Sequence, residues 1–225
     1  MGKILIVVGP TGSGKSRSIK NLDPAKTVVV NILRKDLPFK GSRALYSAQN
    51  KNLANLDKWD EIVGFTEHIS SDRKEVTTLV IDDARFIVEK ELFRRAKETG
   101  YGKFTEMAAH FQKIIEAAEN AREDLNVVLM LHDDDVTSDG AVIAKKVKMS
   151  GKMIEDHYNP LEVVPICLYC KPSLEKTNTT YQFYTHRCMV GTAEIPAKTP
   201  EGMFEGDTIP NDLALVFKAM EEYYG

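Results

Sequence analysis

One contiguous motif constrains this chain more than any other feature of its sequence. Residues 9–16, Gly-Pro-Thr-Gly-Ser-Gly-Lys-Ser, follow the pattern G-x-x-x-x-G-K-[ST] between an apolar β-type run, Lys3 to Val8, and a short helical stretch, Lys15 to Asn21. Glycines allow such a loop to curl until successive backbone N–H groups point at one anion, and the following helix adds the partial positive charge of its N-terminus. The motif therefore predicts a loop that binds phosphate groups, against the alternative of a glycine turn without a ligand.

The side chains of this loop have separate expected roles. The Lys15 ammonium is expected to reach the β- and γ-phosphates of a nucleotide as a point charge, which also makes it a candidate catalytic residue. The Ser16 hydroxyl is expected to hold Mg²⁺. The predicted nucleotide-binding residues are Gly9, Pro10, Thr11, Gly12, Ser13, Gly14, Lys15, Ser16 and Arg17.

A carboxylate is expected at the end of a second core strand, because Mg²⁺–nucleotide sites usually need one. Thr77 to Ile81 has the composition of a buried strand, and Asp82 follows it at the predicted carboxyl edge of the sheet. Asp82 is therefore the predicted metal ligand beside Ser16, with a helix N-cap as its alternative role. The next residue, Asp83, points elsewhere and is expected to orient or deprotonate an attacking water.

Predicted strands and helices alternate along the rest of the chain, except that the stretch Leu33 to Asp60 lacks periodicity and is expected to be irregular. The further strands are predicted over Thr27 to Val30, Asn126 to Leu131, Val163 to Tyr169 and Thr180 to Val190, the last in a hairpin. The further helices are predicted over Ala84 to Lys97, Phe104 to Asn120 and Leu213 to Tyr224. Apolar strands alternating with helices predict an α/β fold, a three-layer α/β/α sandwich around a mostly parallel sheet, closed by a C-terminal hairpin and helix. Residues 1–225 are predicted to form a single domain.

Composition narrows the functional classes. With 43% hydrophobic and 28% charged residues, the chain has the composition of a globular protein rather than of a disordered one. A net charge of −3 excludes a generally basic nucleic-acid coat. The longest apolar runs are strand-sized, far below the roughly 20 residues that span a bilayer. We therefore expect no membrane partner, and the three cysteines fit a reducing, cytoplasmic location.

With the phosphate loop and Asp82-Asp83 in view, the chain resembles P-loop NTPases of the additional-strand type. Among these it is similar to RecA-like ATP-binding proteins of bacteriophages, related to single-strand annealing and recombination ATPases. The resemblance covers nearly the whole chain, but its specific motifs are the phosphate loop and Asp82-Asp83. It implies a RecA-like sheet, ATP and Mg²⁺ as ligands, and an ATPase that serves phage DNA recombination or replication in a bacterial host. It further implies single-stranded DNA as a partner and a homo-oligomer, either a ring or a filament.

The resemblance also implies residues for catalysis. In this family a polar residue that closes the fourth core strand senses the γ-phosphate, and His132 stands at that position, with a solvated histidine at the strand end as the alternative. RecA proteins carry a catalytic glutamate at the end of the second strand, where this chain has Asn31. That departure assigns the activation of water to Asp83, with Glu67 in reserve.

Two partner surfaces follow from the same resemblance. Related ring helicases carry Lys-x-Arg as a finger that reaches a neighbour's nucleotide; Lys198 matches the lysine, but Pro200 stands where the arginine belongs, which leaves Arg187 as a substitute. A DNA-facing loop is expected after the fourth core strand, with a plain solvated face as the alternative. Its candidate phosphate contacts are Lys145, Lys146, Lys148 and Lys152.

Two other functions stay open at the level of sequence. A small nucleoside or nucleotide kinase would share the loop and the size, and Asp82-Asp83-Ala84-Arg85 weakly resembles an acceptor-binding Asp-x-x-Arg. A nucleotide-gated binding module would use ATP as a conformational ligand and hydrolyse little of it. The base of the nucleotide is also open, since no Asn-Lys-x-Asp of the GTPase kind is present.

Overall fold

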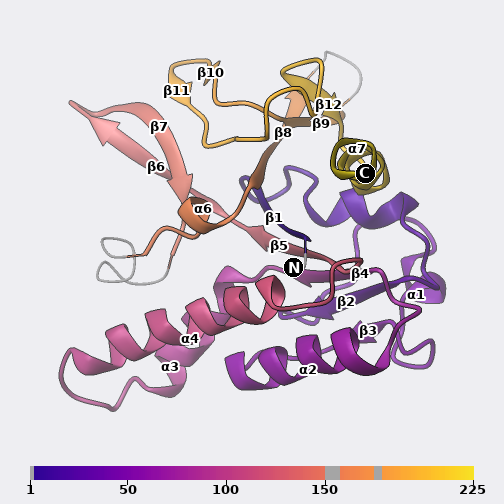
Figure 1. Ribbon diagram of the computed structural model, residues 1–225. Helices are drawn as coiled ribbons and strands as arrows, with labels where there is room; N and C mark the ends of the chain where they lie inside the picture. Colours follow the sequence, from indigo (N-terminus) through magenta and orange to yellow (C-terminus); the bar gives the residue numbers. More distant parts are fainter. Residues whose placement is uncertain (1–2, 150–157, 175–178) are drawn as a thin grey trace.

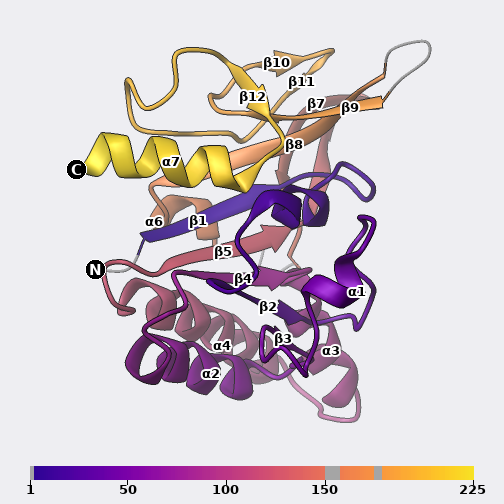
Figure 2. The same cartoon turned by 90° about the vertical axis from the view of Figure 1, so that its right-hand side faces the viewer.

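The computed structural model describes residues 3–149, 158–174 and 179–225, and its core is one twisted sheet with helices on both faces (Figures 1 and 2). In the described part of the chain this main sheet has eight strands in the order β12-β9-β8-β1-β5-β4-β2-β3. Their bounds are β1 Lys3–Val8, β2 Thr27–Asn31, β3 Leu53–Ala54, β4 Thr78–Asp82, β5 Asn126–Leu131, β8 Ile166–Leu174, β9 Thr179–Tyr184 and β12 Thr208–Pro210.

The pairing of the strands confirms the predicted fold class. From β8 through β1, β5, β4 and β2 to β3 every pair is parallel, whereas β9 and β12 join antiparallel at one edge. Strand β5 lies between β1, which leads into the phosphate loop, and β4, which ends at Asp82. The carboxyl ends of these three parallel strands therefore meet at one edge of the sheet.

Sequence alternation explains why both faces of the sheet are covered. In β1, Ile4, Ile6 and Val8 pack into one hydrophobic cluster, while Leu5 and Val7 pack into the other. Successive side chains of a strand point to opposite faces, so an uninterrupted apolar run needs a cover on each side. Helices α2, α3 and α4 cover the first face; α7 and the short helix η1 cover the second (Figure 2).

The helices agree in part with the sequence-based expectations. The predicted helices correspond to α3, α4 and α7, and the short helix after the phosphate loop is a 3₁₀-helix, η1. The expected irregular stretch holds α1 and β3, and a helix that the sequence did not indicate, α2, begins within its last two residues. The bounds are η1 Ser16–Asn21, α1 Ser42–Leu45, α2 Trp59–Asp72, α3 Arg85–Arg94, α4 Gly102–Glu119, α6 Pro160–Val163 and α7 Leu213–Tyr224.

A second sheet, absent from the sequence-based prediction, stands beside the first. Its order is β10-β11-β7-β6, and its antiparallel hairpin β6–β7 projects from the end of β5 (Figure 1). The strands are β6 Asp133–Ser138, β7 Ala141–Val147, β10 Met189–Val190 and β11 Ala193–Glu194. The prediction of one strand over Thr180 to Val190 was wrong, because that stretch is divided between β9 and β10. Among the described residues, no helix has the length and apolar character needed to cross a bilayer.

Candidate functional site

The glycines of the phosphate loop are required by its surroundings. A Cβ atom on Gly9 would overlap the carbonyl oxygen of Cys170 on β8. Gly14 has a φ of +99°, in the region that side chains rarely adopt, and a Cβ there would lie 2.5 Å from the Tyr181 ring. The loop is thus packed against β8 and β9, and its curl depends on residues without side chains.

Lys15 lies over this loop with its ammonium turned inward. Its Nζ donates hydrogen bonds to the carbonyl oxygens of Gly9, at 2.7 Å, and Pro10, at 2.9 Å. The residue is only 6% exposed, and this burial lowers the pKa of Lys15 against the opposing effect of nearby acidic groups that include Asp83 and Asp82. A buried ammonium has three hydrogens to donate, so it is ready to exchange carbonyl oxygens for the oxygens of an anion.

Ser16 and Asp82 meet across the sheet edge. The Ser16 hydroxyl donates a 2.9 Å hydrogen bond to Oδ1 of Asp82. Asp82 is 7% exposed, and burial, followed by the negative charge of Asp83, raises the pKa of Asp82 to about 6. Helix α3 begins at Arg85 with Ala84 as its N-cap, so Asp82 is not a helix cap.

The two oxygen donors, Ser16 and Asp82, fit a hard divalent cation. Mg²⁺ takes oxygen ligands and is usually held by one or two protein groups together with substrate phosphates. A cation at this point would also offset the cost of burying the Asp82 carboxylate. The residues therefore fit Mg²⁺, held by Ser16 and Asp82.

Asp83 lies between two basic side chains at the same edge. Its Oδ2 is 3.3 Å from Lys35 Nζ, and its Oδ1 is 3.7 Å from His132 Nε2. The backbone of Asp83 has a φ of +58°, a conformation that is costly for a residue with a side chain and that often occurs at functional sites. The turn presents the Asp83 carboxylate to Lys35 and His132, while its charge still contributes to the raised pKa of Asp82.

His132, at the end of β5, is neutral in this setting. Burial, followed by the positive charge of Lys15, lowers the pKa of His132 to about 4. Its Nδ1 is buried and has no hydrogen-bond partner among the described residues, and its ring packs edge-on against Phe86. A neutral imidazole can donate from one nitrogen and accept at the other, as a contact to phosphate or water requires.

Lys35 belongs to this site and was missed by the sequence analysis. Asn31, at the end of β2, fixes it: Asn31 Nδ2 donates to the Lys35 carbonyl oxygen at 2.7 Å, and the Lys35 N–H donates to Asn31 Oδ1 at 3.2 Å. Asn31 therefore shapes a turn. No motif marks a lysine in this unpatterned stretch; the only available signal was the polar residue that ends β2. The reserve candidate Glu67 lies on α2, in a groove between α2 and α4.

The C-terminal elements hold the loop from behind. The Cys170 thiol donates to the Ser13 carbonyl oxygen at 2.9 Å, and Asn211 Nδ2 donates to the Cys170 sulfur at 3.1 Å. The Arg17 guanidinium lies 4.9 Å from the centre of the Tyr181 ring. Tyr181 and Asn211 were not among the predicted site residues, because only tertiary contacts bring them to the loop.

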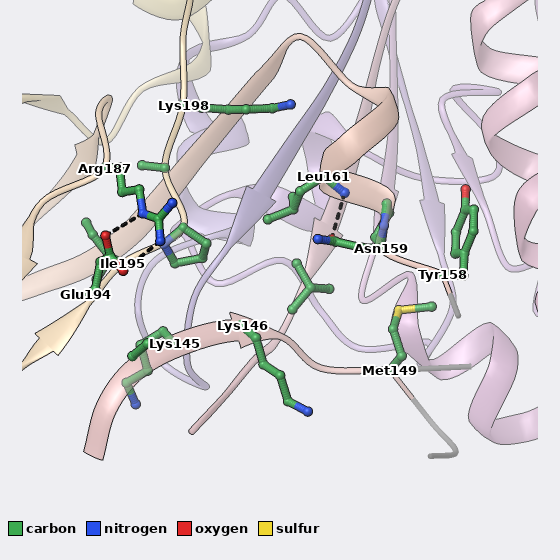
Figure 3. A pocket seen from close by; sticks show the side chains of 15 residues that line it. Lys145, Lys146, Met149, Tyr158, Asn159, Leu161, Arg187, Glu194, Ile195 and Lys198 are labelled. Atoms are coloured by element: carbon green, nitrogen blue, oxygen red, sulfur yellow. Dashed lines mark hydrogen bonds and ion pairs between the residues drawn. The ribbon is translucent and has the colours of Figure 1, made fainter. Parts of the chain in front are cut away.

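The expected finger residues lie elsewhere, around a cavity of about 430 Å³ between β7, α6 and the segment near β11 (Figure 3). Lys198 pairs through its backbone with Cys167 of β8, and its side chain extends across the cavity. Arg187 forms an ion pair with Glu194, with Nη2 at 2.7 Å from Oε2. In this conformation Arg187 is engaged within its own chain.

The lysines expected in a DNA-facing loop lie on the β6–β7 hairpin or just beyond it. Lys145 forms ion pairs with Asp135 and, at 3.7 Å, with Asp133. Lys148 Nζ lies 3.1 Å from Asp134 Oδ1. The hairpin thus sets its aspartates opposite its lysines. Lys146 also lines the cavity, whereas Lys152 lies outside the described residues.

The phosphate loop lies between β1 and η1, and its Ser16 contacts Asp82 at the end of β4. Strand β5 lies between β1 and β4 in the parallel part of the sheet. This arrangement defines a P-loop NTPase. The chain belongs to an AAA domain family, AAA_24, whose sequence model matches residues 1–162. This membership agrees with the P-loop NTPase class that the resemblance implied. Among solved structures, the KaiC-like protein PH0186 from the hyperthermophilic archaeon Pyrococcus horikoshii OT3 is similar, with a TM-score of 0.46 and 12% identity over 81% of this chain and 77% of that one. No curated protein matches the chain.

Proposed function

We propose that this chain binds a magnesium–nucleoside triphosphate, with ATP as the expected nucleotide, and hydrolyses it. The observation that carries the proposal is the convergence of Lys15, Ser16 and Asp82 at one loop, with Ser16 and Asp82 in a 2.9 Å hydrogen bond. A buried ammonium and a buried carboxylate side by side suit a ligand that brings both negative charge and a cation.

In this mechanism the protein positions groups and neutralises charge. Lys15 releases the Gly9 and Pro10 carbonyl oxygens and binds phosphate oxygens. Asp83 accepts a proton from water as the water oxygen attacks the γ-phosphorus; the bond from the γ-phosphorus to the bridging oxygen breaks, which gives a nucleoside diphosphate and inorganic phosphate. His132 donates a hydrogen bond to the terminal phosphate. Ser16 and Asp82 would hold Mg²⁺, which would supply neutralisation of the charge that develops on the phosphate oxygens.

The direct test compares three forms of the full chain: the wild type, Lys15→Ala and Asp83→Asn. We expect Lys15→Ala to lose nucleotide binding, measured by calorimetry. We expect Asp83→Asn to bind the triphosphate like the wild type but to release phosphate roughly 10²- to 10⁴-fold more slowly. Turnover by Asp83→Asn at the wild-type rate would contradict the role of Asp83.

The products formed from ATP separate the hydrolase from the two other candidate functions. Thin-layer analysis of ATP incubated with nucleosides and nucleotides would reveal a phosphorylated acceptor if the chain were a kinase. A nucleotide-gated module would bind ATP through Lys15 yet release no phosphate in either the wild type or Asp83→Asn. Release of free phosphate by the wild type, and much slower release by Asp83→Asn, supports hydrolysis as the function.

The cellular role proposed for this ATPase is phage DNA recombination or replication, exerted as a homo-oligomer on single-stranded DNA. Its support is the resemblance described above. Since Lys145 and Lys148 are ion-paired to aspartates, DNA phosphates would have to displace those carboxylates. Charge reversal at Lys145 and Lys146 should weaken binding and reduce its salt dependence. Turnover is measured with and without single-stranded DNA, and a turnover rate that does not respond to DNA would contradict the role. The mass in solution with a non-hydrolysable nucleotide tests the homo-oligomer.

A further inference from the structure

One cation at the terminal-phosphate side of the site has no role in the mechanism above. Lys35 Nζ lies 3.3 Å from Oδ2 of Asp83, and the side chain of Lys35 is 66% exposed. An ion pair between a mobile, exposed ammonium and a carboxylate contributes little net free energy. Lys35 can therefore leave Asp83 at low cost when a more highly charged anion arrives.

The backbone of Lys35 is held in place, while its side chain is largely exposed. Asn31 binds both the N–H and the carbonyl oxygen of Lys35, and Arg34 between them takes a φ of +57°. In the sheet, Asn31 is the register partner of Asp82. The turn thus anchors a long cationic side chain directly beside the strand that carries the metal ligand.

Lys35 is the adaptable one of the two cations that lie against the Phe86 ring. Arg85 stacks on the Phe86 ring at 4.3 Å and pairs with Glu89 at 2.9 Å, and its side chain is 15% exposed. Lys35 lies 5.9 Å from the centre of the same ring and has Asp83 as its ion-pair partner. Arg85 is therefore committed to its own helix, while Lys35 can respond to a ligand.

The charges of Lys15 and Lys35 act on the same small space. Both cations lower the pKa of His132, which follows β5 and whose Nε2 lies 3.7 Å from Oδ1 of Asp83. A triphosphate bound by Lys15 would place its terminal phosphate within the field of both ammonium groups. Arg187, the other arginine considered for this phosphate, is paired with Glu194 within the chain.

We propose that Lys35 binds the γ-phosphate within its own subunit, exchanging Asp83 for a phosphate oxygen, and so provides the positive charge that related proteins take from a neighbour's finger. The exchange also frees Asp83 to accept a proton from water. This inference rests on the proposed function, because it needs a triphosphate in the loop.

The test uses the full chain and four forms: the wild type, Lys35→Met, Lys35→Arg and Lys40→Met. Lys40 is an exposed lysine further along the same loop and serves as the matched control. Calorimetry with Mg²⁺ measures the affinity for ADP and for a non-hydrolysable ATP analogue. We expect Lys35→Met to bind the analogue about tenfold more weakly and ADP unchanged, and to lower kcat roughly 100-fold. Lys35→Arg should retain most of the affinity for the analogue and most of kcat.

The outcomes separate the two proposals. Lys35→Met and Lys40→Met could have the same ratio of analogue affinity to ADP affinity and the same kcat. That result would overturn the role of Lys35 and leave the proposed nucleotide site intact. A wild type that binds neither nucleotide would overturn the proposed function itself, and this inference with it. Thermal melting of each variant verifies folding, which substitution of an exposed lysine should leave unchanged.

Discussion

Two buried groups of opposite charge are the central feature at the scale of single residues. Burial lowers the pKa of Lys15 and raises the pKa of Asp82, so each group is held in a setting that disfavours its charge. Each attracts the other, but among the described residues the hydrogen-bond partners of the Lys15 ammonium are two carbonyl oxygens. A phosphate for Lys15 and a cation for Asp82 would relieve both costs together.

Asp82→Asn should make the nucleotide-free chain more stable near neutral pH. The raised pKa means that the folded chain holds the proton more tightly than the unfolded chain, so wild-type stability falls as the pH rises from about 4 to about 6. Asparagine avoids this cost and can still accept from Ser16. We expect a gain of about 1–3 kcal/mol at pH 7.5 that disappears below pH 4, measured by urea unfolding with EDTA present. A less stable variant at pH 7.5 would mean that attraction between Lys15 and Asp82 outweighs the cost of burial.

The three cysteines should differ in reactivity. Burial raises the pKa of Cys167 and of Cys170 to about 12, and their side chains lie on opposite faces of β8. Cys188 is only partly buried. Because the thiolate is the reactive form, N-ethylmaleimide at pH 8 should label Cys188 first, and the other two only after unfolding. Mass spectrometry of the native chain checks this; rapid labelling of Cys170 would mean that the loop opens away from β8.

At the scale of elements, the phosphate loop depends on strands that follow it far along the sequence. Tyr181 of β9 packs on Gly14, Cys170 of β8 binds Ser13, and Asn211 after β12 binds Cys170. These contacts come from the antiparallel edge β8-β9-β12, which lies beyond the matched family segment. Elements outside the motif thus support the geometry of the loop.

Two glycine substitutions should therefore have opposite effects. Gly14→Ala meets both a φ of +99° and the Tyr181 ring at 2.5 Å, so we expect a loss of at least 1–3 kcal/mol in stability and of nucleotide binding. Gly64→Ala, in helix α2 with open space around it, should raise stability by about 0.5–1 kcal/mol. Chemical denaturation of both variants gives the comparison. Equal effects would show that local packing at Gly14 does not govern the loop.

At the scale of the whole molecule, one sheet joins the two ends of the chain. β1 pairs with β5 on one side and with β8 on the other, and α7 packs over η1 in the same hydrophobic cluster. The termini of the fold therefore share a core, as Figure 2 shows for β1 and α7. Such a shared core couples the stability of the C-terminal elements to that of the nucleotide site.

The chain should accordingly unfold as a single cooperative unit. Differential scanning calorimetry should show one transition with a calorimetric enthalpy equal to the van't Hoff enthalpy. A magnesium–triphosphate should shift the whole transition upward, because the ligand binds only the folded state. Two transitions, with only one of them sensitive to nucleotide, would contradict a single domain.

What the sequence determined by itself was local. The phosphate loop, the strand before Asp82 and the helical stripe of α4 could be predicted, because each depends on contiguous residues whose spacing matches one backbone geometry. Helix α2 escaped prediction in part because its buried positions Ile62, Thr66 and Ile69 include a polar residue. Its apolar stripe was therefore interrupted.

The tertiary structure decided which distant residues serve the site. Lys35 reaches Asp83, Tyr181 covers Gly14, and the hairpin lysines meet aspartates of the facing strand. None of these pairs is marked by spacing along the chain, because each arises from strand order and turn geometry rather than from a local period. The physical reason is that a motif encodes the conformation of its own backbone, whereas the charges and side chains around it are brought there by the packing of the whole sheet.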